Sequence, residues 1–252
     1  MRNADRWVPS KYVWKRGQLA ASRDPREVGI GSRLITDCVA VFYARELPRV
    51  ARGRLIDLGC GKAPLYEVYR GHVDSVVCVD WPQSVHASPY LDHEVDLSRP
   101  LPFPDASFDT VLLSDVLEHV PDPWLLWSEI ARVLSPGGCL VMNVPFMYGI
   151  HEAPHDYGRY TEFALRHHAA KAGLEVKLLD PIGGSLHVLA DFLAKHIARI
   201  PAIGKLTAGA IQNIVALIDG TRLGKRFSAR TSRSYPLGYF LVAHKPIANR
   251  ID

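Results

Sequence analysis

The sequence predicts an α/β protein built on a parallel, doubly wound sheet, and three features support this. Short apolar or β-branched runs, typical of buried strands, occur at 55–58, 75–80, 108–113 and 139–144. Segments with apolar residues at helical spacing occur at 31–48 and 123–135. A glycine turn, Gly59-Cys60-Gly61, directly follows the first run. Strands that alternate with helices form parallel sheets, which bind ligands at the carboxyl ends of their strands.

The glycine turn predicts a ligand that approaches the backbone closely. Pro64 suits the first turn of a following helix, and an acid at the strand end can accept from a ribose hydroxyl. The dinucleotide fingerprint needs a small residue at its sixth position, where this chain has Pro64. Asp57 also lies just before the glycines, where it would repel phosphate. The turn therefore favours a cationic ligand over a pyrophosphate.

The run at 75–80 ends in an acid, Asp80. An Asp at a strand end is often only a turn residue. The interval from Gly59 to Asp80, however, matches a strand-helix-strand unit whose second strand brings an acid to the ribose. The combination favours ribose binding.

The remaining elements follow from similar signals. We expect a short third strand at 92–96, a proline-rich connection at 99–105, and a helix at 123–135 that Pro136-Gly137-Gly138 ends. A further helix runs from a Thr161 cap to about residue 172, where Gly173 ends it.

Composition indicates an ordinary soluble globular protein. The chain has 252 residues, of which 48% are hydrophobic and 22% charged. Its four cysteines are far apart and form no Cys-x-x-Cys pair, which argues against a disulfide scaffold or a thiolate zinc site. Met1 is followed by a charged, aromatic segment with no apolar signal core. We therefore expect a cytoplasmic setting.

Basic charge is concentrated in one late segment. Residues 186–235 carry eight Lys or Arg and two acids, a net charge of +6 against +4 for the whole chain. Apolar residues at 186–200 and 203–218 follow helical spacing, and neither stretch is long enough to span a bilayer. A helical cap or homodimer surface is one interpretation. Peripheral membrane contact through 186–218 is the other, at the inner face of the membrane. We expect no nucleic-acid partner, because the basic residues form no recognisable motif.

The first thirty residues mix Trp7, Tyr12 and Trp14 with basic side chains. We expect a helical flap there. It either packs its aromatic residues on the domain or acts as a lid that excludes water.

Five motifs then occur in a specific order: Asp57-Leu-Gly-Cys-Gly61, Asp80, Leu101-Pro-Phe-Pro-Asp-Ala-Ser-Phe-Asp109, Asp115-Val-Leu-Glu-His-Val120 and Arg132-Val-Leu-Ser-Pro-Gly-Gly138. In this order the chain resembles class I S-adenosylmethionine-dependent methyltransferases over roughly residues 50–180. The resemblance implies a Rossmann-like, seven-stranded, mostly parallel sheet. Its last strand, at 237–244, would be antiparallel and lie beside the strand at 173–180.

On this basis we expect one methyltransferase domain over residues 1–252. Its parts are an N-terminal helical lid (1–48), a cofactor-binding core (49–180), a helical basic insertion (181–235) and the last strand (236–246).

The resemblance implies ten residues that bind S-adenosylmethionine. They are Asp57, Gly59 and Gly61 at the methionine and ribose, Asp80 at the ribose hydroxyls, Trp81, Asp96 and Leu97 at the adenine, and Ser114, Asp115 and His119 closing the pocket. Acids without a phosphate cradle suit a cationic sulfonium ligand. His119 has a second interpretation, as a helix-start residue that bonds backbone groups.

The acceptor should bind at the loop 145–161, which follows the fifth strand and is rich in polar and aromatic residues. Methyl transfer to a hydroxyl needs alignment and a base for the hydroxyl proton. His151, His155 and Asp156 are the catalytic candidates, with His155 as the favoured base and Asp156 in support. The alternatives are that these residues only pin the loop, or that they hold a divalent ion. The spacing on a loop has no fixed geometry, so no metal ligand is assigned.

Similar methyltransferases with a His-Asp-Tyr-x-Arg-Tyr-Thr segment at this place often accompany enzymes of polysaccharide or glycolipid assembly. The resemblance therefore implies a small-molecule acceptor, a sugar or lipid-linked sugar. Tyr148, Tyr157 and Tyr160 would stack on the sugar ring, and Arg159 would bind a phosphate or carboxylate on it. Two other functions stay open: a natural-product O- or N-methyltransferase that acts by positioning, and a non-catalytic module that kept the cofactor fold.

Overall fold

The computed structural model describes residues 1–83 and 88–247 of the chain. At its centre lies a seven-stranded sheet with the order β5-β4-β3-β6-β7-β9-β8. The strands are β3 (Arg54–Leu58), β4 (Ser75–Asp80), β5 (His93–Glu94), β6 (Phe108–Ser114), β7 (Leu134–Pro145), β8 (Glu175–Ile182) and β9 (Gly238–His244). β9 is antiparallel to both of its neighbours, and the pairs among β3 to β7 are parallel. The predicted doubly wound sheet with an antiparallel last strand is confirmed.

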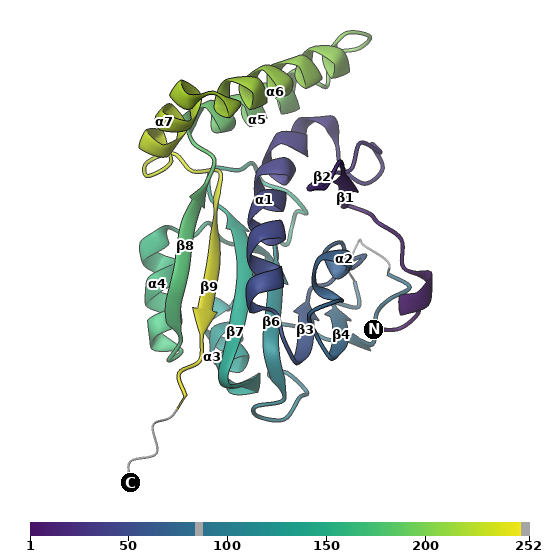
Figure 1. Ribbon diagram of the computed structural model, residues 1–252, viewed down its shortest axis with the longest axis vertical. Helices are drawn as coiled ribbons and strands as arrows, with labels where there is room; N and C mark the ends of the chain where they lie inside the picture. The colour runs from purple at the N-terminus through teal and green to yellow at the C-terminus, as the bar shows by residue number, and fades with distance from the viewer. Residues whose placement is uncertain (84–87, 248–252) are drawn as a thin grey trace.

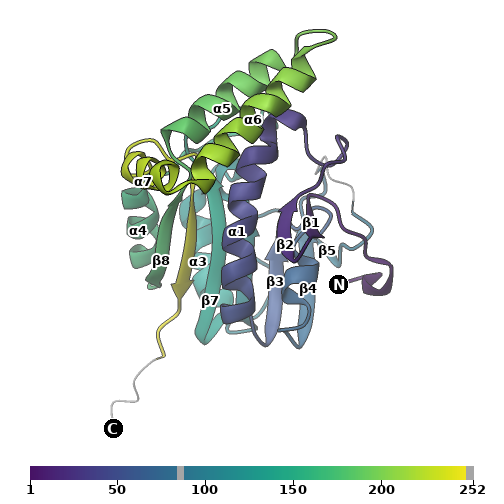
Figure 2. The ribbon, with the colours of Figure 1, turned by 45° about the horizontal axis from the view of Figure 1, so that its top comes forward.

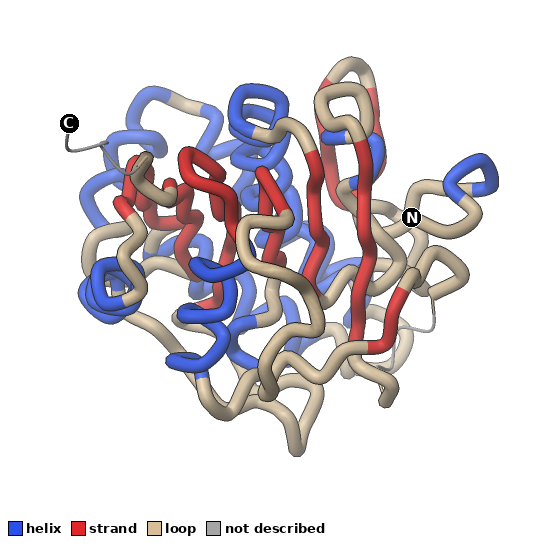
Figure 3. Tube along the Cα trace, turned by 90° about the horizontal axis from the view of Figure 1, so that it is seen from below, coloured by secondary structure: helices blue, strands red, loops and turns tan. Residues whose placement is uncertain are grey.

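Helices cover both faces of the sheet (Figures 1 and 3). α1 (Arg33–Val50) packs Tyr43 and Leu47 on one face, in a core cluster with Leu55 of β3. α3 (Pro123–Val133) and α4 (Glu162–Lys171) contribute to the cluster on the other face. The helix after the glycine turn, α2 (Tyr66–Tyr69), is only four residues long.

Caps define the ends of α3 and α4. The Asp122 side chain accepts from the backbone N–H groups of Trp124 and Leu125, and Thr161 caps α4 as predicted. One boundary differs from the prediction. α3 ends at Val133 and β7 begins at Leu134, so the Pro-Gly-Gly segment lies within the strand. Pairing between Phe108 and Leu134, followed by a register shift, extends the strand backward.

The N-terminal segment contradicts the predicted helical lid. Residues 1–32 contain a β-hairpin, β1 (Tyr12–Lys15) and β2 (Gln18–Ala21), with short 3₁₀ turns η1 (Ala4–Arg6) and η2 (Ile30–Ser32). Arg16 and Gly17 join the strands, both with positive φ (52° and 76°). Two such residues in a row fit the mirror-image turn whose twist matches a hairpin. The helical part of the prediction holds only for α1.

The late insertion forms three helices at one end of the molecule (Figure 2). α5 (Ser185–Ile197) and α6 (Gly204–Gly220) pack together and contact α1, in agreement with the two predicted helices. A third helix, α7 (Arg222–Thr231), was not predicted. Its sequence is mostly polar, and a Thr221 side-chain cap on the Gly224 N–H marks its start. No helix within residues 1–83 and 88–247 has the length and apolar character needed to cross a bilayer.

Candidate functional site

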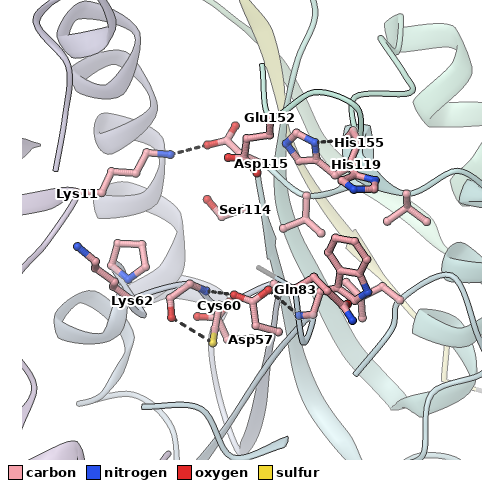
Figure 4. A pocket seen from close by; sticks show the side chains of 18 of the residues that line it. Lys11, Asp57, Cys60, Lys62, Gln83, Ser114, Asp115, His119, Glu152 and His155 are labelled. Carbon is pink, nitrogen blue, oxygen red and sulfur yellow. Dashed lines mark hydrogen bonds and ion pairs between the residues drawn. The ribbon is translucent and has the colours of Figure 1, made fainter. Parts of the chain in front are cut away.

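A cavity of about 510 Å³ opens at the carboxyl ends of β3, β4 and β6. All ten residues predicted to bind the cofactor line it: Asp57, Gly59, Gly61, Asp80, Trp81, Asp96, Leu97, Ser114, Asp115 and His119. The strand ends gather these residues although they are spread over more than sixty positions of the sequence. Figure 4 shows several of them facing the same space.

The glycine turn is held in one conformation by its neighbours. Gly59 has φ of +71°, and a Cβ there would lie 2.5 Å from Cγ2 of Val116. Gly61 donates its backbone N–H to Oδ2 of Asp80 at 2.9 Å. Asp80 thus ties the first turn to the end of the second strand. The predicted partnership of the two motifs is present in the structure.

Asp57 lies at the base of this cavity and is almost entirely buried, with 3% of its surface exposed. The Tyr69 hydroxyl donates to it at 3.4 Å. Burial, with a smaller contribution from the negative charge of Asp80, raises the pKa of Asp57 to about 7. A cation bound nearby would favour the ionised form. The short α2 offers no long helix for a pyrophosphate, so the cavity fits a cationic nucleoside better than a dinucleotide.

Two lysines at the cavity wall are each neutralised by an acid. Lys11 meets Asp115 at 2.7 Å (Figure 4), and Lys62 meets Glu27 at 2.7 Å. Lys11 and Glu27 come from the N-terminal segment, from which the sequence analysis named no site residue. The only signal was the suggestion of a lid. No single residue type could have shown that this segment reaches the strand ends.

A second cavity of about 230 Å³ adjoins the first. The two cavities share Lys11, Glu27, Asp115, His119 and Glu152 in their walls. Beyond these, the second cavity is lined by residues of the N-terminal segment, α1, the end of β6 and the loop after β7, among them Ser32, Glu118, Tyr148 and His151.

The loop after β7 pairs its polar residues differently from the prediction. Asp156 accepts from Arg159 at 2.5 and 2.8 Å and from the backbone N–H of His151 at 2.9 Å. The Arg159 guanidinium holds the pKa of Asp156 well below its usual range. Nδ1 of His151 lies 3.4 Å from Asp156 Oδ2. Asp156 therefore supports His151, and the predicted His155–Asp156 pair is wrong.

His155 instead lies on the cofactor side. Its Nδ1 is 3.2 Å from the Tyr157 hydroxyl, and its ring stands edge-on to Trp81 with centroids 4.8 Å apart. His155 and Tyr157 line the first cavity, and neither is among the residues lining the second. His155 thus lies beside the residue expected to meet the adenine.

Of the four residues predicted to bind the acceptor, only Tyr148 lines the second cavity. Tyr157 lines the first. Arg159 lines neither of these two cavities, because it is bound to Asp156 and to backbone carbonyls of the loop. Tyr160 is buried and donates its hydroxyl to the Leu117 carbonyl at 3.4 Å. Arg159 and Tyr160 thus make contacts within the protein, and their predicted contacts with the acceptor stay predictions.

Between the two cavities lies a cluster that the sequence analysis did not name as a unit: Glu118, His119 and His151. Glu118 and His119 belong to η3 (Leu117–His119), the turn that follows β6. Oε1 of Glu118 lies 3.8 Å from Nε2 of His119 and 3.7 Å from Nε2 of His151. Burial raises the pKa of the Glu118 carboxyl. His151 thus contacts Glu118 on one side and Asp156 on the other, whereas His155 does not belong to this cluster.

Comparison with known proteins gives a family match to the methyltransferase domain over residues 56–142. An uncharacterized methyltransferase of a Mycobacterium species is 42% identical over 72 residues, which are 27% of this chain and 29% of that protein. The 27-O-demethylrifamycin SV methyltransferase of Amycolatopsis mediterranei is 32% identical over 112 residues, 40% of this chain and 41% of that protein. The matches thus span less than half of these curated relatives.

Solved structures share the fold over most of their length. The [4+2]-cyclase SpnF has a TM-score of 0.54 at 20% identity, covering 96% of this chain and 88% of that one. An S-adenosylmethionine-dependent methyltransferase from Mesorhizobium loti has a TM-score of 0.53 at 16% identity, covering 84% and 99%. At such identities the likeness concerns the fold alone, and the pair shows that this fold supports more than one reaction.

Proposed function

We propose that this chain is a class I S-adenosylmethionine-dependent methyltransferase that transfers a methyl group to a hydroxyl of a small acceptor. The family match and the sheet topology confirm the predicted class and its cofactor, S-adenosylmethionine. The observation that carries the proposed reaction is the pair of adjoining cavities. One cavity is lined by all ten predicted cofactor residues, and the other shares Lys11, Asp115 and His119 with it.

The residues of the first cavity fit the cofactor. When bound, S-adenosylmethionine supplies an electrophilic methyl group on a positively charged sulfur. Asp80 would receive the ribose hydroxyls while its other contacts keep the glycine turn in place. Asp57 supplies negative charge at the base of the cavity, where its ionised form is stabilised by a cationic ligand.

We propose that the acceptor binds in the second cavity. Methyl transfer requires the acceptor oxygen to approach the methyl carbon in line with the bond that breaks. The two cavities share lining residues, so a small molecule in the second would lie next to a cofactor in the first. As the new C–O bond forms, the C–S bond to the methyl group breaks and S-adenosylhomocysteine leaves, so the acceptor hydroxyl needs a group that lowers its pKa or takes up its proton. We assign this task to Glu118, His119 and His151, in place of His155.

For the acceptor we propose a sugar or lipid-linked sugar. Tyr148 presents a ring at the second cavity, with its hydroxyl 3.2 Å from that of Ser32 and Nζ of Lys195 lying 3.2 Å from the ring centroid. An aromatic face beside polar groups suits a sugar ring. A natural-product hydroxyl is the second candidate, supported by the partial similarity to the rifamycin O-methyltransferase.

The insertion supports the lipid-linked form of this acceptor. Lys195 of α5 connects the insertion to Tyr148 and therefore to the second cavity. The insertion also exposes large apolar side chains, including Leu206 and Leu217 of α6 and Leu223 of α7. With its net charge of +6 it complements an anionic lipid surface. We propose that the insertion lies on such a surface and that the acceptor enters from it.

The test is turnover with isotopically labelled S-adenosylmethionine and a panel of acceptors: simple glycosides, glycolipids in vesicles and polyketide alcohols. We expect a methylated product from a glycoside or glycolipid, identified by mass spectrometry. A product only from polyketide alcohols would favour the second candidate. A chain that binds the cofactor in calorimetry but methylates no acceptor would contradict the enzymatic proposal.

A further inference from the structure

The Glu118 side chain is a buried carboxylate without a hydrogen-bond partner. It has 0% of its surface exposed, and neither Oε1 nor Oε2 accepts a hydrogen bond within the described part of the chain. A buried polar group normally finds a partner, and an isolated carboxylate is costly to bury. Its position beside the second cavity therefore indicates that a ligand completes it.

The two neighbouring imidazoles each place Nε2 toward this carboxyl group. Nδ1 of His119 lies 2.5 Å from the His155 carbonyl oxygen. A carbonyl only accepts, so this Nδ1 carries the proton, and Nε2 lies toward Glu118, where it can bind a ligand when the ring is neutral.

His151 repeats the arrangement. Its Nδ1 lies 3.3 Å from the Gly149 carbonyl and 3.4 Å from Oδ2 of Asp156, while its Nε2 faces Glu118. Such outer contacts from a carbonyl or a carboxylate orient metal-binding histidines.

The spacing matches ligands of one ion. One ligand atom from each of Glu118, His119 and His151 lies within 4.8 Å of the others. The two carboxylate–imidazole distances, 3.7 and 3.8 Å, are too long for hydrogen bonds. Ligands that bind a common cation at about 2.1 Å lie roughly 3 to 4 Å apart. We propose that Glu118, His119 and His151 bind a divalent transition-metal cation.

The ligand types define the class of cation. Two imidazoles and one carboxylate suit zinc, manganese or iron(II), whereas magnesium and calcium prefer oxygen ligands. Three protein ligands leave coordination positions open toward the second cavity. There the cation would bind the acceptor oxygen and lower the pKa of its hydroxyl. This role rests on the proposed function, whereas the binding of the cation does not.

Metal binding is tested on the tag-free, chelator-treated full chain without cofactor or acceptor. Mn²⁺ is titrated and followed by electron paramagnetic resonance, and Co²⁺ by visible absorption. We expect one ion per chain and a Co²⁺ spectrum with nitrogen ligation. Glu118→Gln and His151→Gln should each weaken binding at least tenfold. His72→Gln, at an exposed position outside the cluster, is the matched control and should bind as the wild type does.

Two measurements separate misfolding and the proposed function from the metal site. Thermal melting and calorimetry with S-adenosylmethionine should show that both variants stay folded and bind the cofactor. Absence of Mn²⁺ and Co²⁺ binding in the wild type would overturn the metal site, as would equal binding in Glu118→Gln and His151→Gln. Methyl transfer that survives chelation would then leave the proposed function standing. If the chain binds the ion but transfers no methyl group, the metal site stands and the proposed function is contradicted.

Discussion

Asp57 is a buried carboxyl whose ionisation lowers the stability of the folded protein. Its carboxyl is buried at the base of the cofactor cavity, and burial raises its pKa to about 7 against 3.8 in the unfolded chain. Between these two values the folded protein binds a proton that the unfolded chain releases, so stability falls as pH rises from about 4 to about 7. Above this window the folded state has lost up to about 4 kcal/mol.

Most substitutions of buried residues lower the free energy of unfolding, whereas Asp57→Asn should raise it at a pH where Asp57 is ionised. Relative to the wild type, we expect the variant to gain stability on going from about pH 5 to about pH 8, because it has no carboxyl to ionise. Its affinity for S-adenosylmethionine should fall at least tenfold. Urea denaturation at both pH values and calorimetry measure the two effects. A stability difference independent of pH would contradict the assignment of the raised pKa to Asp57.

His151 and His155 should separate kinetically. His151 belongs to the cluster at the second cavity, so His151→Gln should lower kcat at least a hundredfold with little change in the KM for S-adenosylmethionine. His155 lies against Trp81, so His155→Gln should mainly raise that KM. Steady-state kinetics with the accepted substrate provide the comparison. If instead His155→Gln lowers kcat and His151→Gln mainly raises the KM for S-adenosylmethionine, His155 is the base.

The two sides of the site differ in how far the sequence could predict them. The residues predicted to bind the cofactor follow strand ends, and parallel strands bring their carboxyl ends to one edge, so spacing along the chain was enough to predict that they line one cavity. On the loop after β7, Asp156 had two histidines and Arg159 within reach. Its choice of Arg159 and His151 depends on loop conformation, which no periodicity encodes. Glu118 lies within the motif at 115–120, and nothing in that segment distinguishes it as a residue that pairs with His151.

At the scale of elements, the turn between β3 and α2 depends on Gly59. We expect Gly59→Ala to destabilise the protein by about 2 to 4 kcal/mol, since it adds a strained positive φ and an overlap with Val116. Cofactor affinity should fall with it. Gly71→Ala is the control, because Gly71 has no positive φ and an added Cβ there meets no atom within 4 Å. Chemical denaturation and calorimetry on both variants test this. Equal stability of the two variants would contradict the proposed steric constraint at Gly59.

Other elements show where local patterns mislead. The hairpin β1–β2 was expected as a helix because aromatic and basic residues were judged by composition. In the structure Arg16 and Gly17 both have positive φ, as a mirror-image hairpin turn requires, but an Arg-Gly pair is a weaker turn signal than Asn-Gly or Asp-Gly. α7 was missed for a related reason. Its apolar residues are few, so its helix depends on capping by Thr221 and on packing against α5 and α6.

At the scale of the whole molecule, the three helices of the insertion lie together at one end of the molecule (Figure 2). They carry the basic residues and the exposed apolar side chains of the insertion. α5 and α6 rest on α1, and Gln212 of α6 accepts from the backbone N–H of Leu34. The insertion is therefore firmly attached to the core. Any surface that it binds would be held at a fixed position relative to the acceptor cavity.

Binding of the insertion to anionic lipid is measured by co-sedimentation with vesicles that contain phosphatidylglycerol. We expect binding that weakens at least fivefold between about 50 and 300 mM salt, because the attraction is partly electrostatic. The double variant Leu206→Glu/Leu217→Glu should bind at least tenfold more weakly, since both side chains are more than 70% exposed on α6. Val41→Glu, an exposed position on α1, is the control. If light scattering instead shows a stable dimer that this double variant dissociates, and vesicles are not bound, the apolar face is a homodimer surface. A lipid-linked acceptor would then lose its structural support, whereas methyl transfer to a soluble glycoside would not.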